Sequence, residues 1–230
     1  MKHMLKIRRT GALLVVLVTA VAGIVASPDF YQQQASPSAH VVVSGDAVKM
    51  LETLPIKGRA PKTHYSRDQF GDGWANERGC DTRNVILRRD LKGVVLNDKC
   101  QVVSGILDDS YTGKTIQFTR GASTSGSVQI DHVVALSDAW QKGAQQLSAA
   151  KREALANDPL ELLAVDGMAN QQKSDGDAAT WLPPNKPFRC QYVARQVAVK
   201  KKYTLWVTQA EKDAILRVLS ACPDQALPIE

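Results

Sequence analysis

Four polar residues in the middle of the chain are of the types that could hydrolyse a phosphodiester bond. Asp131 and His132 end one apolar run, and Asn170 and Lys173 follow a second apolar run. An imidazole can take a proton from water near neutral pH, whereas carboxylate and amide oxygens suit a hard divalent cation such as magnesium. Such a cation would neutralise charge on the phosphate and on its leaving oxygen.

The segments around these residues predict the elements that must bring them together. The run VQIDHVVAL predicts a strand, LELLAV predicts a second strand, and MANQQKSDGD predicts the start of a helix. Neighbouring side chains on a strand point to opposite faces, so Asp131 and His132 can serve one site only where the strand ends or twists. The amide ligand must then come from the following helix.

The flanking segments predict a mixed α+β domain. Residues 93–120 have the composition of strands, and turn residues within them favour a hairpin. Ser137 and Ser148 are candidate N-caps of helices between the two central strands. Two further helices are predicted near the C-terminus, and the second starts at Thr208, which has the spacing of a capping box with Glu211.

Residues 62–92 are dense in charge and contain aromatic side chains among arginines. Such a mixture suits a surface that binds phosphate, and Arg67 and Arg83 are the candidates for those contacts. The alternative is that both arginines hold the loop in place through ion pairs. His64 is a weaker second histidine candidate. The lysines at positions 200–202 form either a track for nucleic acid or the polar face of a helix.

The N-terminal segment differs in composition from the rest of the chain. Basic residues precede an uncharged run, rich in Leu, Val and Ala, from Gly11 to Ala26, which is typical of a secretory signal peptide. The run is short for a membrane span of roughly 20 apolar residues, and an uncleaved anchor is the alternative. Four of the 29 Lys and Arg residues lie here, against 23 Asp and Glu in the whole chain. Net charge is therefore weak support for a nucleic-acid partner.

The cysteines Cys80, Cys100, Cys190 and Cys222 are even in number, and the export predicted from the N-terminal segment would place the chain in an oxidising compartment. Both features favour disulfide bonds, for which three pairings are possible. The pairs Cys80–Cys100 and Cys190–Cys222 are preferred, because each closes a local loop and the two flank the central segment. A zinc site would need closely spaced Cys or His residues, and the sequence has none at such spacing.

Several sequence blocks resemble a known family, the exported bacterial HNH endonucleases related to the C-terminal domain of GmrSD-type restriction enzymes. These blocks are IDHVVALSDAWQKGA, LELLAVDGMANQQKSD, WLPP, YSRDQFGDGW, GCDTRNVILRRDL, DDSYTGKTIQF, CQYVARQVAVKKKY and the final cysteine, Cys222. The resemblance covers residues from about 62 to 222. It implies an α+β fold with a ββα-metal (HNH) core, elaborated by an N-terminal β-hairpin region, C-terminal helices and two disulfides.

The resemblance also implies a role for each central residue. His132 is expected to be the general base, and Asp131 and Asn170 the ligands of one divalent metal ion, Mg²⁺ or alternatively Mn²⁺. Lys173 is expected to be a basic catalytic residue near the phosphate, with a solvated lysine as the alternative. Many members have an asparagine at the start of the second strand, which braces the loop between the strands. This chain has Glu161 there, so the bracing is in question.

The expected function is metal-dependent endonucleolytic cleavage of DNA, with RNA as a second possible substrate. The protein is expected to be a monomer outside the cytoplasm, with no membrane partner beyond an N-terminal anchor. The alternative is a catalytically silent protein on the same scaffold that binds nucleic acid or an envelope component. A non-nuclease hydrolase has no motif to support it, because the sequence contains no G-x-S-x-G, no H-E-x-x-H and no P-loop. The predicted organisation is a signal peptide or anchor (1–27), a linker with a short helix (28–55), the HNH nuclease domain (56–223) and a tail (224–230).

Overall fold

The computed structural model describes residues 46–228. The predicted signal peptide or anchor, residues 1–27, and most of the predicted linker lie outside the described residues. Between residues 46 and 228, no helix combines the length and the apolar character that crossing a membrane requires.

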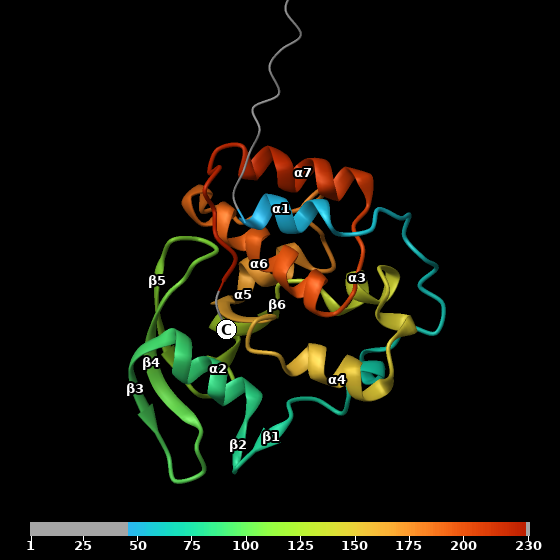
Figure 1. The fold of residues 1–230 in the computed structure, drawn as a ribbon. Coiled ribbons are helices and arrows are strands. Elements are labelled where there is room, and N and C mark those ends of the chain that lie inside the picture. The colour runs from blue at the N-terminus through green and yellow to red at the C-terminus, as the bar shows by residue number, and fades with distance from the viewer. Residues whose placement is uncertain (1–45, 229–230) are drawn as a thin grey trace, which may run out of the picture. The chain divides into compact units, whose positions relative to one another are not determined.

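Helices and short antiparallel strands alternate along the described chain (Figure 1). In order, with η marking a 3-10 helix, the elements are α1 (Asp46–Glu52), η1 (Arg67–Phe70), β1 (Asn76–Glu77), β2 (Cys80–Asp81), α2 (Thr82–Asp90), β3 (Leu91–Leu96), β4 (Val102–Asp108), β5 (Thr115–Thr119), η2 (Ser125–Ser127), β6 (Val128–His132), α3 (Leu136–Gln141), η3 (Ala144–Gln146), α4 (Ala149–Asn157), β7 (Leu162–Asp166), α5 (Gly167–Lys173), η4 (Lys186–Phe188), α6 (Arg189–Lys202) and α7 (Gln209–Leu219). The predicted α+β class is confirmed.

A two-stranded sheet and the helix that follows it carry the central residues. β6 pairs antiparallel with β7, so that His132 lies opposite Leu162 at the end of the ladder. α5 begins directly after β7, where the side chain of Asp166 accepts a hydrogen bond from the backbone N–H of Ala169. Gly167 is required at the start of this helix, because a Cβ there would lie 2.0 Å from the backbone oxygen of Gly126. The predicted order of two strands followed by a helix is thus present.

The helices between β6 and β7 follow the prediction in one case and differ in the other. Ser148 caps α4 by accepting a hydrogen bond from the backbone N–H of Lys151, as predicted. Ser137 does not cap α3, because that helix begins at Leu136. The Ser137 hydroxyl instead donates to the carboxylate of Asp175, 3.3 Å away. The sequence gives no indication of this acceptor, because Asp175 lies far from Ser137 along the chain.

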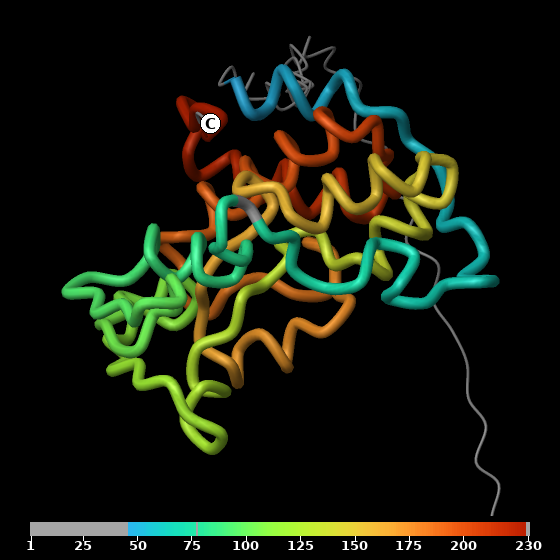
Figure 2. The backbone as a smooth tube through the Cα atoms, turned by 90° about the horizontal axis from the view of Figure 1, so that it is seen from below, coloured from blue at the N-terminus to red at the C-terminus, as the bar shows by residue number. Residues whose placement is uncertain are grey.

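The region before β6 contains a three-stranded antiparallel sheet in the order β3–β4–β5. The hairpin between β4 and β5 is confirmed, and the backbone N–H of Asp109 closes its turn on the oxygen of Lys114. The helix α2 was not predicted. It starts where Asp81 accepts a hydrogen bond from the backbone N–H of Asn84, and it buries part of one face. In Figure 2 the sheet, in green, lies at one side of the described domain.

The C-terminal helices α6 and α7 pack with α1 into a helical layer (Figures 1 and 2). Thr208 caps α7 by accepting from the backbone N–H of Glu211, as predicted. The return half of the capping box does not form, because the Glu211 carboxylate is buried among lysines. Both predicted disulfides are present, with Cα–Cα distances of 5.3 Å for Cys80–Cys100 and 6.4 Å for Cys190–Cys222.

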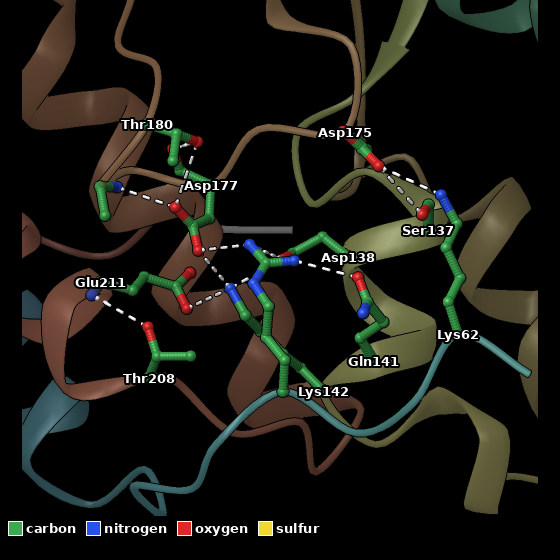
Figure 3. A network of polar contacts seen from close by, with 12 residues as sticks. Lys62, Ser137, Asp138, Gln141, Lys142, Asp175, Asp177, Thr180, Thr208 and Glu211 are labelled. Atoms are coloured by element: carbon green, nitrogen blue, oxygen red, sulfur yellow. Dashed lines mark hydrogen bonds and ion pairs between the residues drawn. The ribbon is translucent and has the colours of Figure 1, made fainter.

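A buried network of charges joins these helices to the core (Figure 3). The ammonium of Lys142 lies 2.7 Å from a carboxylate oxygen of each of Asp138, Asp177 and Glu211. These four side chains are almost completely buried. The network links α3 and α7 with the segment that follows α5.

Two further cations complete this network. Lys200 lies 3.0 Å from Glu211 and 3.4 Å from Asp138. The guanidinium of Arg59 lies 2.9 Å from Asp138 and 2.8 Å from Asp177. Lys200 is fully buried, so it belongs neither to a track for nucleic acid nor to a solvated helix face. The helical spacing of the lysines in the sequence could not distinguish an exposed lysine from one that is buried in an ion pair.

Replacing Asp177 by Asn should destabilise the protein by about 3 kcal/mol at pH 7, because it leaves buried cations short of a partner. The ion pairs with Lys142 and Arg59 outweigh burial and lower the pKa of Asp177 to about 2. Its stabilisation is therefore present above pH 4 and is lost as the pH falls towards 2. Denaturant unfolding of both proteins at pH 7, 5 and 3 should show the difference narrowing in acid.

Asp175→Asn is the matched control for this experiment. Asp175 pairs with Lys62, and both side chains are about half exposed, so its loss should change stability by less than about 1 kcal/mol. An Asp177→Asn variant as stable as the wild-type protein at pH 7 would show that the network does not hold the fold.

Candidate active site

The end of β6 borders a polar pocket of about 390 Å³. Its lining includes Asp131, His132, Asn170, Arg67, Tyr65 and Lys62. β6 supplies the first two residues, α5 supplies the amide, and the segment before α2 supplies the last three. Three of the four central residues selected from the sequence therefore meet at one pocket.

Asp131 is held from two sides beneath this pocket. The hydroxyl of Tyr111 donates a short hydrogen bond to Oδ2, and the ammonium of Lys173 lies 2.9 Å from Oδ1. Lys173 also donates to the backbone oxygen of His132 at 2.8 Å. Burial raises the pKa of Asp131, while Lys173 and Tyr111 act in the opposite direction. The carboxylate is thus fixed in position by groups from the β4–β5 turn and from α5.

Lys173 does not lie where the resemblance placed it. Its side chain is fully buried, and it does not line the polar pocket. The expected contact with phosphate and the alternative of a solvated lysine both require an exposed ammonium. The structure instead gives Lys173 the role of holding Asp131 and the end of β6.

His132 is buried and has a defined tautomer. Its Nε2 lies 3.0 Å from the backbone oxygen of Ala156. A carbonyl oxygen can only accept, so Nε2 carries the hydrogen and Nδ1 keeps its lone pair. The indole of Trp74 stacks on the imidazole, with ring centroids 5.6 Å apart and planes 5° from parallel. Burial, followed by the charge of Arg67, lowers the pKa of His132 to about 3, which keeps the ring neutral.

Asp131 and Asn170 fit a hard divalent cation. The side-chain N–H of Asn170 donates to Gln129 at 2.8 Å, which leaves its oxygen free to be a ligand. Each oxygen of Asp131 accepts one hydrogen bond and keeps a second lone pair. Oxygen donors of these types are preferred by Mg²⁺ and Mn²⁺. Between residues 46 and 228, no cluster of three or more His, Cys, Asp or Glu could hold a metal ion.

Glu161 braces the loop that follows His132. Both of its carboxylate oxygens lie 3.2 Å from the backbone nitrogen of Val134. The backbone oxygen of Glu161 also accepts from Val133 at 2.9 Å. Burial raises the pKa of Glu161 well above its usual value. The departure from the usual asparagine therefore leaves the loop braced, through an acidic side chain.

The two candidate phosphate-binding arginines have different positions. Arg67 is exposed and lines the polar pocket. Arg83 lies on α2, donates to the backbone oxygen of Val128 at 3.2 Å and lines no pocket near His132. Its pKa is lowered, chiefly by burial. His64 is exposed and also lies outside the pocket lining. The structure brings Arg67 to the site but not Arg83 or His64.

Sequence reasoning missed Tyr111 and Trp74 as parts of this site. Both residues lie in blocks that carried the family resemblance, DDSYTGKTIQF and YSRDQFGDGW. Neither has a spacing relative to Asp131 or His132 that would indicate contact. Membership of those blocks was the one available signal.

Two comparisons with known proteins found relatives of this chain. The family model described as "GmrSD restriction endonucleases, C-terminal domain" matches residues 81–218. The chain is 36% identical over 179 residues to a protein of Arthroderma benhamiae named "Uncharacterized secreted protein", covering 76% of this chain and 84% of that protein. No solved structure matches. The bacterial origin that the resemblance suggested stays a prediction.

The matched region contains the whole β–β–α core and every residue of the site except those that precede residue 81. It covers more than half of the chain, and the secreted relative covers more still. The chain therefore belongs to the family of the C-terminal domain of GmrSD restriction endonucleases.

Proposed function

We propose that this protein is an exported, metal-dependent endonuclease of the HNH type, which cleaves phosphodiester bonds of DNA in preference to RNA. Family membership supports a nuclease. The observation that supports the catalytic assignment is the hydrogen bond from Nε2 of His132 to Ala156, because it leaves a neutral imidazole whose Nδ1 keeps its lone pair, on a residue that lines the pocket.

Hydrolysis would begin with a water molecule in the polar pocket. His132 takes a proton from this water at Nδ1, and the hydroxide attacks phosphorus while the bond to the 3′ oxygen breaks. Asp131 and Asn170 would hold a divalent cation, magnesium or manganese. When bound, such an ion neutralises negative charge on the phosphate and on the leaving oxygen.

The surrounding residues position these groups. Lys173 and Tyr111 hold Asp131, and Glu161 fixes the backbone after His132. Arg67 is exposed and lines the pocket, so its guanidinium is accessible to a non-bridging phosphate oxygen. The alternative proposed role, binding nucleic acid or an envelope component without cleavage, would use the same surface.

Export is proposed from the N-terminal segment, which has the composition of a signal peptide. The two disulfides suit an oxidising compartment, and the relative of 36% identity is named a secreted protein. We propose that the secreted form is a monomer.

His132→Ala should lower the rate of plasmid cleavage about 1,000-fold, because it removes the general base. The assay uses purified protein with Mg²⁺ or Mn²⁺, and chelation by EDTA should abolish cleavage by the wild-type protein. His64→Ala is the matched control and should keep the wild-type rate. Undiminished cleavage by the His132 variant would contradict the assignment. Absence of cleavage of plasmid, single-stranded DNA and RNA by the wild-type protein would favour the non-cleaving alternative.

Arg67→Ala should weaken binding of nucleic acid. It should also reduce the magnitude of the negative slope of log K, the association constant, against log salt concentration by about one, since one phosphate contact is lost. Arg83→Ala should leave that slope unchanged, because its guanidinium contacts Val128 and lies away from the pocket. Binding is measured in EDTA by fluorescence anisotropy across a salt series. The opposite pattern, with the larger change in the Arg83 variant, would move the phosphate-binding surface to α2.

A further inference from the structure

A second pocket, here called the aromatic pocket, adjoins the polar pocket at the catalytic histidine. Its volume is about 420 Å³, within the range of roughly 300–1,000 Å³ that is usual for ligand pockets. His132, Arg67 and Leu136 line both pockets. None of the hydrolytic steps proposed above uses this second space.

The walls of the aromatic pocket are largely apolar. They include Phe70, Trp74, Leu136 and Ala156. Trp74 is held in place by parallel stacking on the imidazole of His132. Phe70 is buried. A rigid aromatic surface of this kind stacks well with a planar ligand, and stacking of a nucleobase on such a side chain contributes about 1–3 kcal/mol.

The polar residues of the pocket exclude a phosphate and admit a neutral group. Asp68 and Asp72 line it and are exposed. Their charges repel phosphate, and their oxygens can accept hydrogen bonds from the N–H groups on the edge of a base. Arg67, the cation of the pocket, lies on the side shared with the polar pocket.

In the polar pocket Arg67 is joined by Lys62. The carboxylates of that pocket are already paired, Asp131 with Lys173 and Asp175 with Lys62. Phosphate is therefore favoured in the polar pocket and a base in the aromatic pocket.

The turn between Phe70 and Trp74, which lines the aromatic pocket, requires glycine at two positions. Gly71 and Gly73 have φ of +99° and +113°, backbone conformations that are strained for other residues. This turn places Asp72 and Trp74 on the lining of the same pocket.

We propose that the aromatic pocket binds the nucleobase next to the scissile phosphate, and that the preferred substrate is therefore a single or locally unpaired strand. This inference rests on the proposed function, because it assigns the phosphate to the polar pocket. A base within a duplex is stacked and paired, so it must leave the helix to enter such a pocket, whereas an unpaired base does so at small cost.

Binding in EDTA tests the pocket without cleavage. The probes are a strand of eight deoxycytidines and a strand of eight tetrahydrofuran abasic units, which carries the same phosphates without bases. The wild-type protein should bind the cytidine strand about tenfold more tightly, as stacking of one base predicts. Trp74→Leu should bring the two affinities within about threefold, mainly by weakening binding of the cytidine strand. Its unchanged affinity for the abasic strand would show that the variant is folded.

Arg67→Ala is the matched control, and it should weaken binding of both strands by the same factor because it acts on phosphate. Equal affinity of the wild-type protein for both strands would overturn the proposal. A Trp74→Leu variant that keeps the full preference for the cytidine strand would also overturn it.

Cleavage with Mg²⁺ locates the bound base relative to the broken bond. A single-stranded oligonucleotide with one abasic unit should be cut about tenfold more slowly at the bond beside that unit, while the other bonds keep their rates. The matching duplex should be cut more slowly than the single strand. Uniform cutting past the abasic unit, or faster cutting of the duplex, would refute the base subsite. Absence of cleavage in every strand would contradict the proposed nuclease, and the EDTA experiment would still decide whether the pocket binds a base.

Discussion

The buried ion pair between Lys173 and Asp131 is the interaction on which the geometry of the site depends. It joins the last turn of α5 to β6, and the same ammonium also binds the backbone oxygen of His132. Removing one partner from a buried pair leaves an uncompensated charge, which costs about 3–5 kcal/mol. α5 therefore cannot shift along the sheet without losing these bonds. Asn170 lies on this helix, so its distance from Asp131 is set by the same constraint.

Around this pair, hydrogen bonds and ion pairs between elements far apart in the sequence hold the domain together. Tyr111 brings the β4–β5 turn onto Asp131, and Glu161 fixes the loop after β6. The network of Lys142 and its carboxylates joins α3 and α7 with the segment after α5 (Figure 3). Each disulfide closes a local segment, one beside α2 and one between α6 and the end of α7. Asp131 and His132 are thus each fixed by more than one partner.

His132 lies at the boundary between two chemical environments. On one side are the oxygen donors of Asp131 and Asn170, and on the other is the indole of Trp74. Its hydrogen bond to Ala156 determines which ring nitrogen keeps the lone pair. Stacking and burial restrict the orientation of the ring and favour its neutral form. As the proposed general base, an imidazole held in this way would lose little conformational freedom on acting on a substrate.

Local sequence patterns determined much of the secondary structure of this protein. The β–β–α order, the caps Ser148 and Thr208 and the hairpin before the core follow from residues close together in the sequence, and the spacing of the cysteines favoured the disulfide pairs that form. Tertiary structure alone decided that Lys173 and Lys200 are buried, that Glu161 still braces the loop after His132, and that Trp74 stacks on His132. A lysine on a helix has the same sequence signature whether it faces water or a carboxylate. The difference depends on partners from distant elements, and only packing brings those partners together.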